Sequence, residues 1–381
     1  MQNIKLIYNS VKAVRVDIKK KPIVIEINRE KIDSDVLLYI VGKIKFLLNY
    51  KLLKFNVLLK FKKLSFADKI TYLMLDGIIY DLFKRTNFNI AIICDSEDKD
   101  NLHNDGFSGT ALYRTMRKVG YLDKKTFLEE YEKKIYNDQR TYRRFLDRET
   151  LNDKETPSII NSEVASVLKS YSNNEEWIDS ISEVASELVC NVSSHADGDC
   201  VLDINFNDNI KYNGNNMEES CTLVNISIMN FGEDRLFDKL KRNIKDKKYS
   251  ENDKLYKKVY RAYDNHKHLF DERYTENHFF LITAFQNHVT TRSFKSGNSG
   301  TGLTRLIENI IGISKEDYSY VLSGEEILIF KSEFLKVSDE KFIGFNKESD
   351  YINFKPEDRV LNKSRLYIPG TIYNLLLIKE N

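Results

Sequence analysis

The amino-acid sequence predicts an α+β protein of two units, a smaller α/β domain over residues 1–155 and a larger one over residues 156–381. Two observations predict this class. A strand, a helix and a strand follow one another in the first unit, whereas the second unit alternates helices with paired strands. At 381 residues, the chain is also long enough for two domains that each bury a core of their own.

Three consecutive segments of the first unit predict a parallel βαβ crossover. Residues 54–61 and 88–95 are apolar runs of strand length, and residues 66–85 between them carry apolar side chains at helical spacing. A strand, a helix and a strand in this order normally form a crossover with parallel strands. The highly charged residues 127–149 predict an amphipathic helix that leads out of the domain, and the segment around Pro157 is the expected boundary.

The second unit is predicted to contain two helices, followed by strands and a long polar insert. On the second helix, Ile181, Ala185, Leu188 and Val192 form an apolar stripe. The resulting sandwich is expected to pair these helices with a sheet. The predicted helices are residues 162–172 and 176–196, and the predicted strands are 199–207, 221–231, 318–324, 325–330 and 371–378.

A polar face runs beside that apolar stripe. Glu187, Asn191 and His195 follow one another at steps of four, so their side chains lie on one side of the helix. Such a face is most often simply exposed to water. An ordered series of acid, amide and imidazole on a helix that is otherwise apolar can instead contact a ligand.

Two glycine-containing segments could approach the same ligand. Asn230-Phe231-Gly232 ends a predicted strand, where a glycine lets another group come close to the backbone. Gly297, Gly300 and Gly302 precede a predicted helix, whose first N–H groups can hold a phosphate. Taken singly, the first segment is usually a turn and the second a helix cap.

Composition excludes several classes of protein. The net charge of +2 gives no reason to expect nucleic-acid binding by the whole molecule. No apolar run approaches the ~18 residues of a membrane span, and the first residues lack the apolar core of a signal peptide. We therefore expect a cytoplasmic protein without membrane contact. The four cysteines show no C-x-x-C pair, so neither disulfides nor a structural metal is expected.

The order of these motifs resembles the GHKL superfamily of ATP-binding domains, whose Bergerat fold occurs in gyrase, heat-shock chaperones, mismatch-repair ATPases and histidine kinases. Glu187 and Asn191, with His195 one turn later, are similar to the family's N-box, E-x-x-x-N on a helix. Residues 230–234 are similar to its first glycine box, Asp-x-Gly-x-Gly, but Asn230 replaces the Asp and Asp234 replaces the second Gly.

Two further motifs extend the resemblance over residues 161–381. Gly300-Thr301-Gly302-Leu303 is similar to the second glycine box before a helix, and Gly370-Thr371 is similar to the Gly-Thr that opens the last strand in many members. The family's fold implies a mixed sheet covered by helices. It also implies a lid between the two glycine boxes, here residues 233–296.

The resemblance implies ATP and Mg²⁺ as cofactors. Asn191 would ligate Mg²⁺, Glu187 would polarise the attacking water, and His195 would contact a phosphate or pack beneath the lid. Asn230 would accept a hydrogen bond from the adenine amino group through its amide oxygen, without the charge of an Asp. The remaining expected nucleotide contacts are Gly232, Thr291, Gly300, Thr301, Gly302, Leu303 and Thr371.

The expected lid is unusually basic. Residues 235–261 hold eleven Lys and Arg against four Asp and Glu in a run that looks helical. One interpretation is a solvated, mobile lid helix, and the other is a surface for an anionic partner such as DNA or RNA.

Three functions remain open at this point. The first is an ATP-hydrolysing conformational switch that acts on a protein partner through the N-terminal domain, with a homodimer as a further possibility. The second is a protein serine kinase similar to anti-sigma kinases, because residues 54–95 vaguely resemble the STAS domains that such kinases bind. The third is a nucleotide-binding scaffold that does not hydrolyse ATP.

Overall fold

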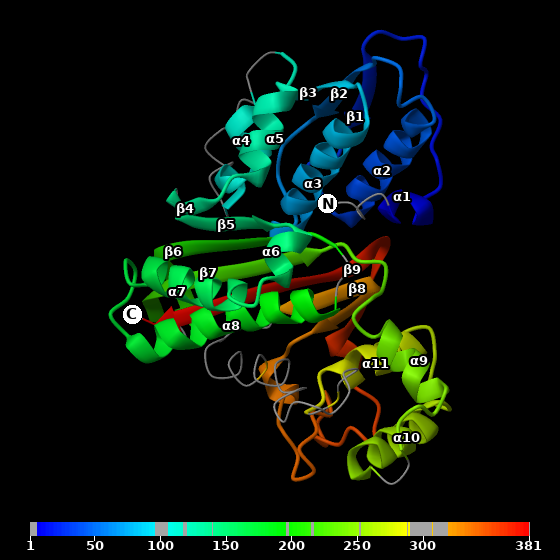
Figure 1. Cartoon of the computed structure of the whole chain (residues 1–381), viewed down its shortest axis with the longest axis vertical. Coiled ribbons are helices and arrows are strands. Elements are labelled where there is room, and N and C mark those ends of the chain that lie inside the picture. Colours follow the sequence, from blue (N-terminus) through cyan, green and yellow to red (C-terminus); the bar gives the residue numbers. More distant parts are fainter. Residues whose placement is uncertain are drawn as a thin grey trace.

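The protein contains a three-stranded parallel sheet and a six-stranded antiparallel sheet, with helices packed on both (Figure 1). The structure is a computed structural model that describes residues 6–95, 106–116, 120–138, 140–195, 198–214, 217–250, 253–287, 289, 307 and 319–380. The predicted α+β class is confirmed. Among the helices of this described part, none is long and apolar enough to span a lipid bilayer.

The N-terminal domain confirms the predicted βαβ crossover. Residues Val57 and Ile90 are partners in parallel strands, and the helix between those strands begins after Asp68, whose carboxylate accepts a hydrogen bond from the Thr71 N–H. The strands are β1 (Ile23–Ile27), β2 (Asn56–Phe61) and β3 (Asn89–Cys94), and the helices are α1 (Leu6–Ser10), α2 (Ser34–Leu48), α3 (Lys69–Arg85) and α4 (Ala111–Thr115).

The prediction of a single helix over residues 127–149 is wrong. Helix α5 (Lys124–Glu132) ends early, and the chain continues as a hairpin of β4 (Ile135–Asp138) and β5 (Thr141–Leu146). Asn137 and Arg140 at this hairpin have φ of 53° and 58°, which a continuing helix does not allow. The high charge of this segment favoured a helix in the sequence analysis.

That hairpin belongs to the second sheet, because β5 pairs with the strand that begins at Cys200. The predicted boundary at residues 155–156 therefore does not separate the two sheets. Pro157 lies in the first turn of α7 (Thr156–Leu168), where the missing N–H of proline costs the helix nothing. A short helix, α6 (Arg148–Asn152), joins the hairpin to it.

The larger sheet has the order β4-β5-β6-β7-β9-β8, and every pairing among its described strands is antiparallel. The prediction of a mixed sheet is thus wrong for this part of the chain. Hairpins join β4 to β5 and β6 to β7, and a hairpin reverses the strand direction. The remaining strands are β6 (Cys200–Gly214), β7 (Met217–Asn230), β8 (Tyr320–Ile329) and β9 (Leu361–Glu380).

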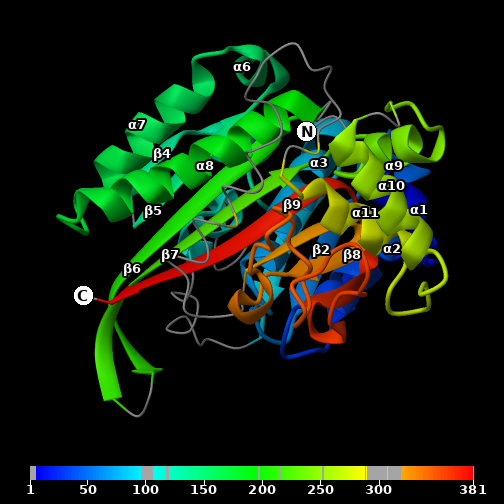
Figure 2. The same cartoon turned by 90° about the horizontal axis from the view of Figure 1, so that it is seen from below.

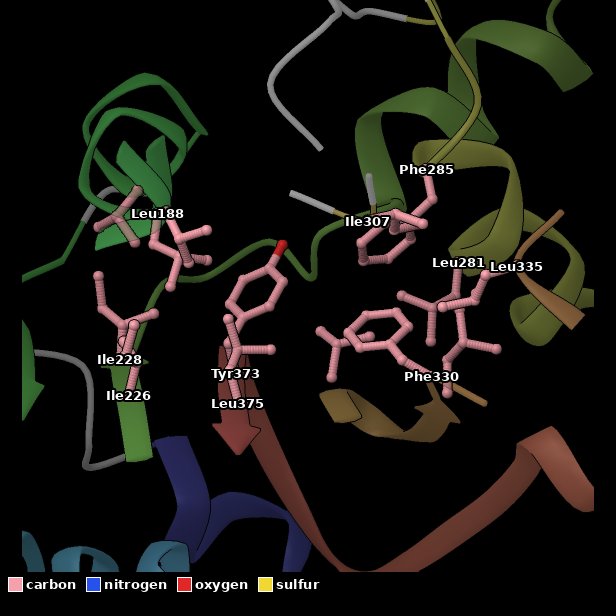
Figure 3. Packing of buried hydrophobic residues seen from close by; sticks show 14 of the residues in the cluster. Leu188, Ile226, Ile228, Leu281, Phe285, Ile307, Phe330, Leu335, Tyr373 and Leu375 are labelled. Carbon is pink, nitrogen blue, oxygen red and sulfur yellow. The ribbon is translucent and has the colours of Figure 1, made fainter. Parts of the chain in front are cut away.

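One face of this sheet is covered by α7 and by α8 (Glu175–His195) (Figure 2). The predicted apolar stripe of α8 is confirmed, since Ile181, Ala185, Leu188 and Val192 are all buried. These side chains share a core with residues of β7 and β9, among them Ile226, Ile228 and Leu375 (Figure 3). The polar face of α8 is therefore fixed relative to β7 and β9.

The N-terminal domain covers the opposite face of the same sheet (Figure 2). Val201, Met229 and Ile372 on that face belong to the core that also contains the side chains of α2 and α3. The contact includes a buried ion pair, because Lys69 Nζ lies 2.9 Å from Asp203 Oδ1. The same ammonium donates to the carbonyl of Asn225 at 2.7 Å. The strands of the larger sheet are thus enclosed between two layers of helices.

The segment expected to form the lid packs as two helices and not as one solvated helix. They are α9 (Asp238–Lys245) and α10 (Lys254–His266), and buried Leu240 and Tyr256 belong to the same core as α8. A third helix, α11 (Glu276–Ala284), lies against them and against β8. Basic side chains of α9 are paired: Lys241 and Lys245 lie 2.5 and 3.1 Å from Glu276. Short turns at Ser332–Phe334 and Asp358–Val360 complete this region.

Protonation of His266 is expected to unfold this helical region in acid. Burial lowers the pKa of His266 from 6.5 to about 4, so between these values the unfolded chain takes up a proton that the folded chain excludes. Stability is then complete above pH 6.5 and falls by roughly 3 kcal/mol as the pH drops to 4. Denaturant unfolding at several pH values should show this slope reduced in His266→Phe. Equal slopes in the two proteins would contradict the assignment.

Candidate functional site

The polar face of α8 presents an amide to the sheet. Asn191 is half-buried in the last turns of the helix, and its Nδ2 atom is buried with no hydrogen-bond partner among the described residues. Glu187 lies one turn earlier and is half-buried. His195 is the last residue of α8, and its side chain lies outside the described part of the chain. A buried donor without a partner is costly unless a ligand or water binds it.

A second amide lies at the end of β7. The side chain of Asn230 is buried, and its Nδ2 donates to the carbonyls of Gly198 and Asp199 at 3.3 and 3.4 Å. With both amide hydrogens directed at the backbone, the Oδ1 atom is the group that can accept a further hydrogen bond. Asn230 therefore offers a fixed, neutral acceptor at the edge of the site.

The glycine of the Gly-Thr motif lets β9 approach this position closely. Gly370 has φ of +93°, and a Cβ atom there would lie 2.4 Å from the carbonyl oxygen of Asn230 and 2.6 Å from the N of Gly232, which is itself buried. The next residue, Thr371, is the ladder partner of Asn230. The prediction that this pair opens the last strand is wrong, because β9 begins at Leu361 and the pairing with β8 shifts near Gly324.

A small pocket brings these elements together: it encloses about 20 Å³, and about 340 Å³ when the open space around it is counted. It contains three of the predicted site residues, Asn191 of α8, Asn230 of β7 and Thr371 of β9. Glu187 does not line it. The complete lining is Asn191, Val192, Asn230, Asp234, Arg235, Leu236, Thr371 and Tyr373. The predicted contacts Thr291, Gly300, Thr301, Gly302 and Leu303 lie outside the described residues.

Tyr373 is a site residue that the sequence reasoning missed. Its ring is buried, and its hydroxyl has no hydrogen-bond partner within the described chain. Figure 3 shows this hydroxyl pointing away from the sheet, into the space between Leu188 and Ile307. Its position two residues after Thr371 could have predicted that it faces the pocket, because alternate residues of a strand lie on the same face.

A cation, Arg235, is among the residues that line the pocket. Arg235 donates to Asp238 at 2.7 and 3.0 Å, and its guanidinium lies 4.6 Å from the centre of the Phe237 ring. Burial alone would lower the pKa of Arg235, but the hydrogen bonds and charge of Asp238 outweigh it and raise that pKa. Arg235 therefore stays charged. The adjacent Asp234, which lines the pocket, pairs with Arg242 at 3.0 Å.

The oxygen atoms of this pocket could supply only some of the ligands of a metal ion. Within the described chain, no group of three or more His, Cys, Asp and Glu side chains is arranged to hold a metal ion. The Oδ1 atom of Asn191 is an oxygen ligand of the kind that Mg²⁺ prefers, and Mg²⁺ commonly completes its shell with phosphate and water. Asn191 alone therefore fits Mg²⁺ only if a phosphate compound binds with it.

Comparison of the chain with protein-family models, with curated proteins and with solved structures found no match in any of the three.

Adding a methyl group at Gly370 is expected to distort the pocket. Gly370→Ala would place Cβ against Asn230 and Gly232, and the positive φ adds backbone strain, so we expect a loss of at least about 3 kcal/mol in the free energy of unfolding. Gly120→Ala is the matched control, because Gly120 has φ of +126° with no described atom within 4 Å. It should cost only about 1–2 kcal/mol. Equal losses in denaturant unfolding would contradict the close approach at Gly370.

Proposed function

We propose that the chain binds ATP with Mg²⁺ in this pocket, as a divergent member of the GHKL superfamily, and acts as a nucleotide-dependent switch. One observation carries the proposal. Asn191, Asn230 and Thr371, which belong to three separate sequence motifs, line one pocket with Tyr373, and Asn191 Nδ2 and Tyr373 Oη are buried without a hydrogen-bond partner among the described residues. A cytoplasmic location, where ATP is available, is part of the proposal.

The arrangement of elements supports a Bergerat-type fold for residues 161–381. Two helices, α7 and α8, cover one face of an antiparallel sheet, and Asn191 of α8 lines a pocket with Asn230 at the end of β7 and Thr371 in the middle of β9. The sheet departs from the expected mixed pairing, and the basic segment of residues 235–261 is packed. We therefore base the family assignment on the site and its supporting helix.

The adenine end of the pocket is assigned to Asn230. Its Oδ1 atom can accept from an exocyclic amino group, and its Nδ2 atom is already engaged by backbone carbonyls. Thr371 is next to it and shares a hydrogen bond of 3.1 Å with Ser323. A pocket that offers a fixed acceptor favours adenine, which carries an amino group, over guanine, which carries a carbonyl at the same position.

The phosphate end is assigned to Asn191 and Tyr373. Their Nδ2 and Oη atoms are donors that lack a hydrogen-bond partner among the described residues. Arg235 also lines the pocket, but Asp238, at 2.7 Å, offsets its charge. Mg²⁺, when bound, neutralises phosphate charge, and the Oδ1 atom of Asn191 would hold it. Glu187, one turn from Asn191, would polarise the attacking water as a general base.

Two alternatives use the same pocket. A protein serine kinase would transfer the phosphate to a partner, and the STAS-like character suggested for residues 54–95 would then belong to the kinase chain itself. A scaffold would bind ATP without turnover. A protein partner at the N-terminal domain and a homodimer are compatible with the switch, the kinase and the scaffold. A nucleic-acid partner at residues 235–261 is not part of the proposal, because Lys241, Arg242 and Lys245 are held in ion pairs.

A calorimetric titration with ATP, with and without Mg²⁺, tests the proposal. Wild-type protein should bind ATP with higher affinity in Mg²⁺, and Asn191→Ala should remove most of that difference. Tyr373→Phe should weaken binding roughly three- to tenfold by removing one hydrogen bond to the ligand. The same variant should not destabilise the free protein, since the hydroxyl has no partner among the described residues.

GTP is the control ligand, and it should bind less well than ATP. Absence of ATP binding, or binding that neither Asn191→Ala nor Tyr373→Phe changes, would contradict the assignment. Released phosphate, phosphate transferred to a protein, or neither would then distinguish the switch, the kinase and the scaffold.

A further inference from the structure

Positive charge is concentrated at the start of the chain. Residues 1–69 hold sixteen Lys and Arg against six Asp and Glu, whereas the whole chain carries a net charge of only +2. The excess belongs to the N-terminal domain. Such an asymmetry indicates a surface for an anionic partner, provided that the charges gather in one place and are not neutralised within the fold.

The sheet register gathers two lysine segments at one edge. Because β1 and β2 are parallel and Ile23 is the partner of Val57, the residues before each strand meet at the amino-terminal edge of this sheet. Those residues are Lys19–Lys21 and Lys51–Lys54. They lie at the end of the N-terminal domain that points away from the six-stranded sheet, at the top of Figure 1. We call this surface the distal patch.

The lysines of the distal patch are exposed and free of ion pairs. Lys19, Lys20 and Lys21 have no carboxylate within ion-pair distance among the described residues, and the same holds for Lys51 and Lys54. The nearby carboxylate of Asp17 accepts a hydrogen bond from the backbone N of Lys19. The patch therefore keeps most of its positive charge.

Two leucines project from the middle of this charge. Leu52 and Leu53 are 81% and 51% exposed, unusually high values for large apolar side chains. Their turn is held in place: the N of Leu53 donates to the carbonyl of Tyr50 at 2.9 Å, and Asn87 donates to the carbonyls of Lys51 and Leu52. The fold thus presents the leucines outward in an ordered turn.

In place of the sequence-based expectation of no membrane contact, we propose that the distal patch docks onto an anionic lipid surface, with Leu52 and Leu53 inserted among the acyl chains and the surrounding lysines bound to headgroup phosphates. The aliphatic part of a lysine side chain can lie beside inserted apolar residues while its ammonium group reaches the lipid headgroups. Anionic lipid attracts each basic residue near its surface, and five lysines in two segments satisfy that pattern. Exposed leucines gain nothing from the phosphate backbone of nucleic acid, so lipid is favoured.

Vesicle co-sedimentation of the full chain tests the proposal. Wild-type protein should bind vesicles of phosphatidylcholine mixed with phosphatidylserine. Its binding to vesicles of phosphatidylcholine alone should be much weaker. Reversal of three charges, K19E/K20E/K21E, should lower the vesicle affinity by at least about a hundredfold, since each lysine contributes about fivefold. L52S/L53S should lower it roughly tenfold or more while leaving the salt dependence intact.

The matched control is K169E/K336E/K347E, which reverses three exposed lysines outside the patch and changes the net charge equally. It should keep most of the vesicle binding. Equal loss in the control, or no loss in either patch variant, would overturn the proposal. Binding to a single-stranded oligonucleotide or a DNA duplex that depends on Lys19–Lys21, without vesicle binding, would also overturn it.

Discussion

Replacing Glu187 with alanine is expected to reduce ATP turnover by about 10²–10⁴-fold while leaving the affinity for ATP nearly unchanged. The expectation follows from position: Glu187 is half-buried one turn before Asn191 on α8, and it does not line the pocket that would hold the nucleotide. Its carboxylate can act on a water at the phosphate end without contributing to binding. The measurement is steady-state phosphate release beside a calorimetric titration.

Glu183→Ala is the matched control, because Glu183 lies one turn further from Asn191 on the same helix and is exposed. It should leave turnover within about twofold of wild type. If Glu187→Ala kept full activity, or if it abolished binding as well, Glu187 would not be the general base.

Replacing Asp76 with alanine is expected to cost about 3–5 kcal/mol in the free energy of unfolding. Asp76 on α3 and Arg143 on β5 form an ion pair of 2.7 Å with both side chains almost fully buried, so the substitution leaves a guanidinium without its counter-ion. The same carboxylate accepts from the N of Leu112 at 2.8 Å, at the start of α4. Denaturant unfolding monitored by circular dichroism measures the loss.

Two comparisons isolate the buried charge as the cause. The double variant Asp76→Leu/Arg143→Met removes both charges and should recover a large part of the loss, because neither ion remains unpaired. Glu30→Ala breaks the exposed pair with Lys62 and should cost less than about 1 kcal/mol. A double variant no more stable than Asp76→Ala would contradict this explanation.

The spacing of apolar residues correctly predicted those helices and strands that bury one face against a core. The crossover over residues 54–95 and the apolar stripe of α8 were predicted correctly, because each pattern reports directly on which side faces a core. The hairpin of β4 and β5 was not. Its charged residues include Arg143, which is buried in an ion pair with Asp76, a residue far away in the sequence.

The candidate site was predicted in part. Motif order pointed to Asn191, Asn230 and Thr371, and the structure places all three around one pocket. Tyr373 was missed because an aromatic residue in an apolar strand looks like an ordinary core residue. Its unpartnered hydroxyl appears only once the neighbours from other elements are known.

The most direct test of the central claim is a structure of the chain determined with Mg²⁺ and a non-hydrolysable ATP analogue. We expect the adenine amino group within hydrogen-bond distance of Asn230 Oδ1, about 3 Å, and the phosphates and metal beside Asn191 and Tyr373. A nucleotide bound away from Asn191, Asn230 and Tyr373 would contradict the proposed site.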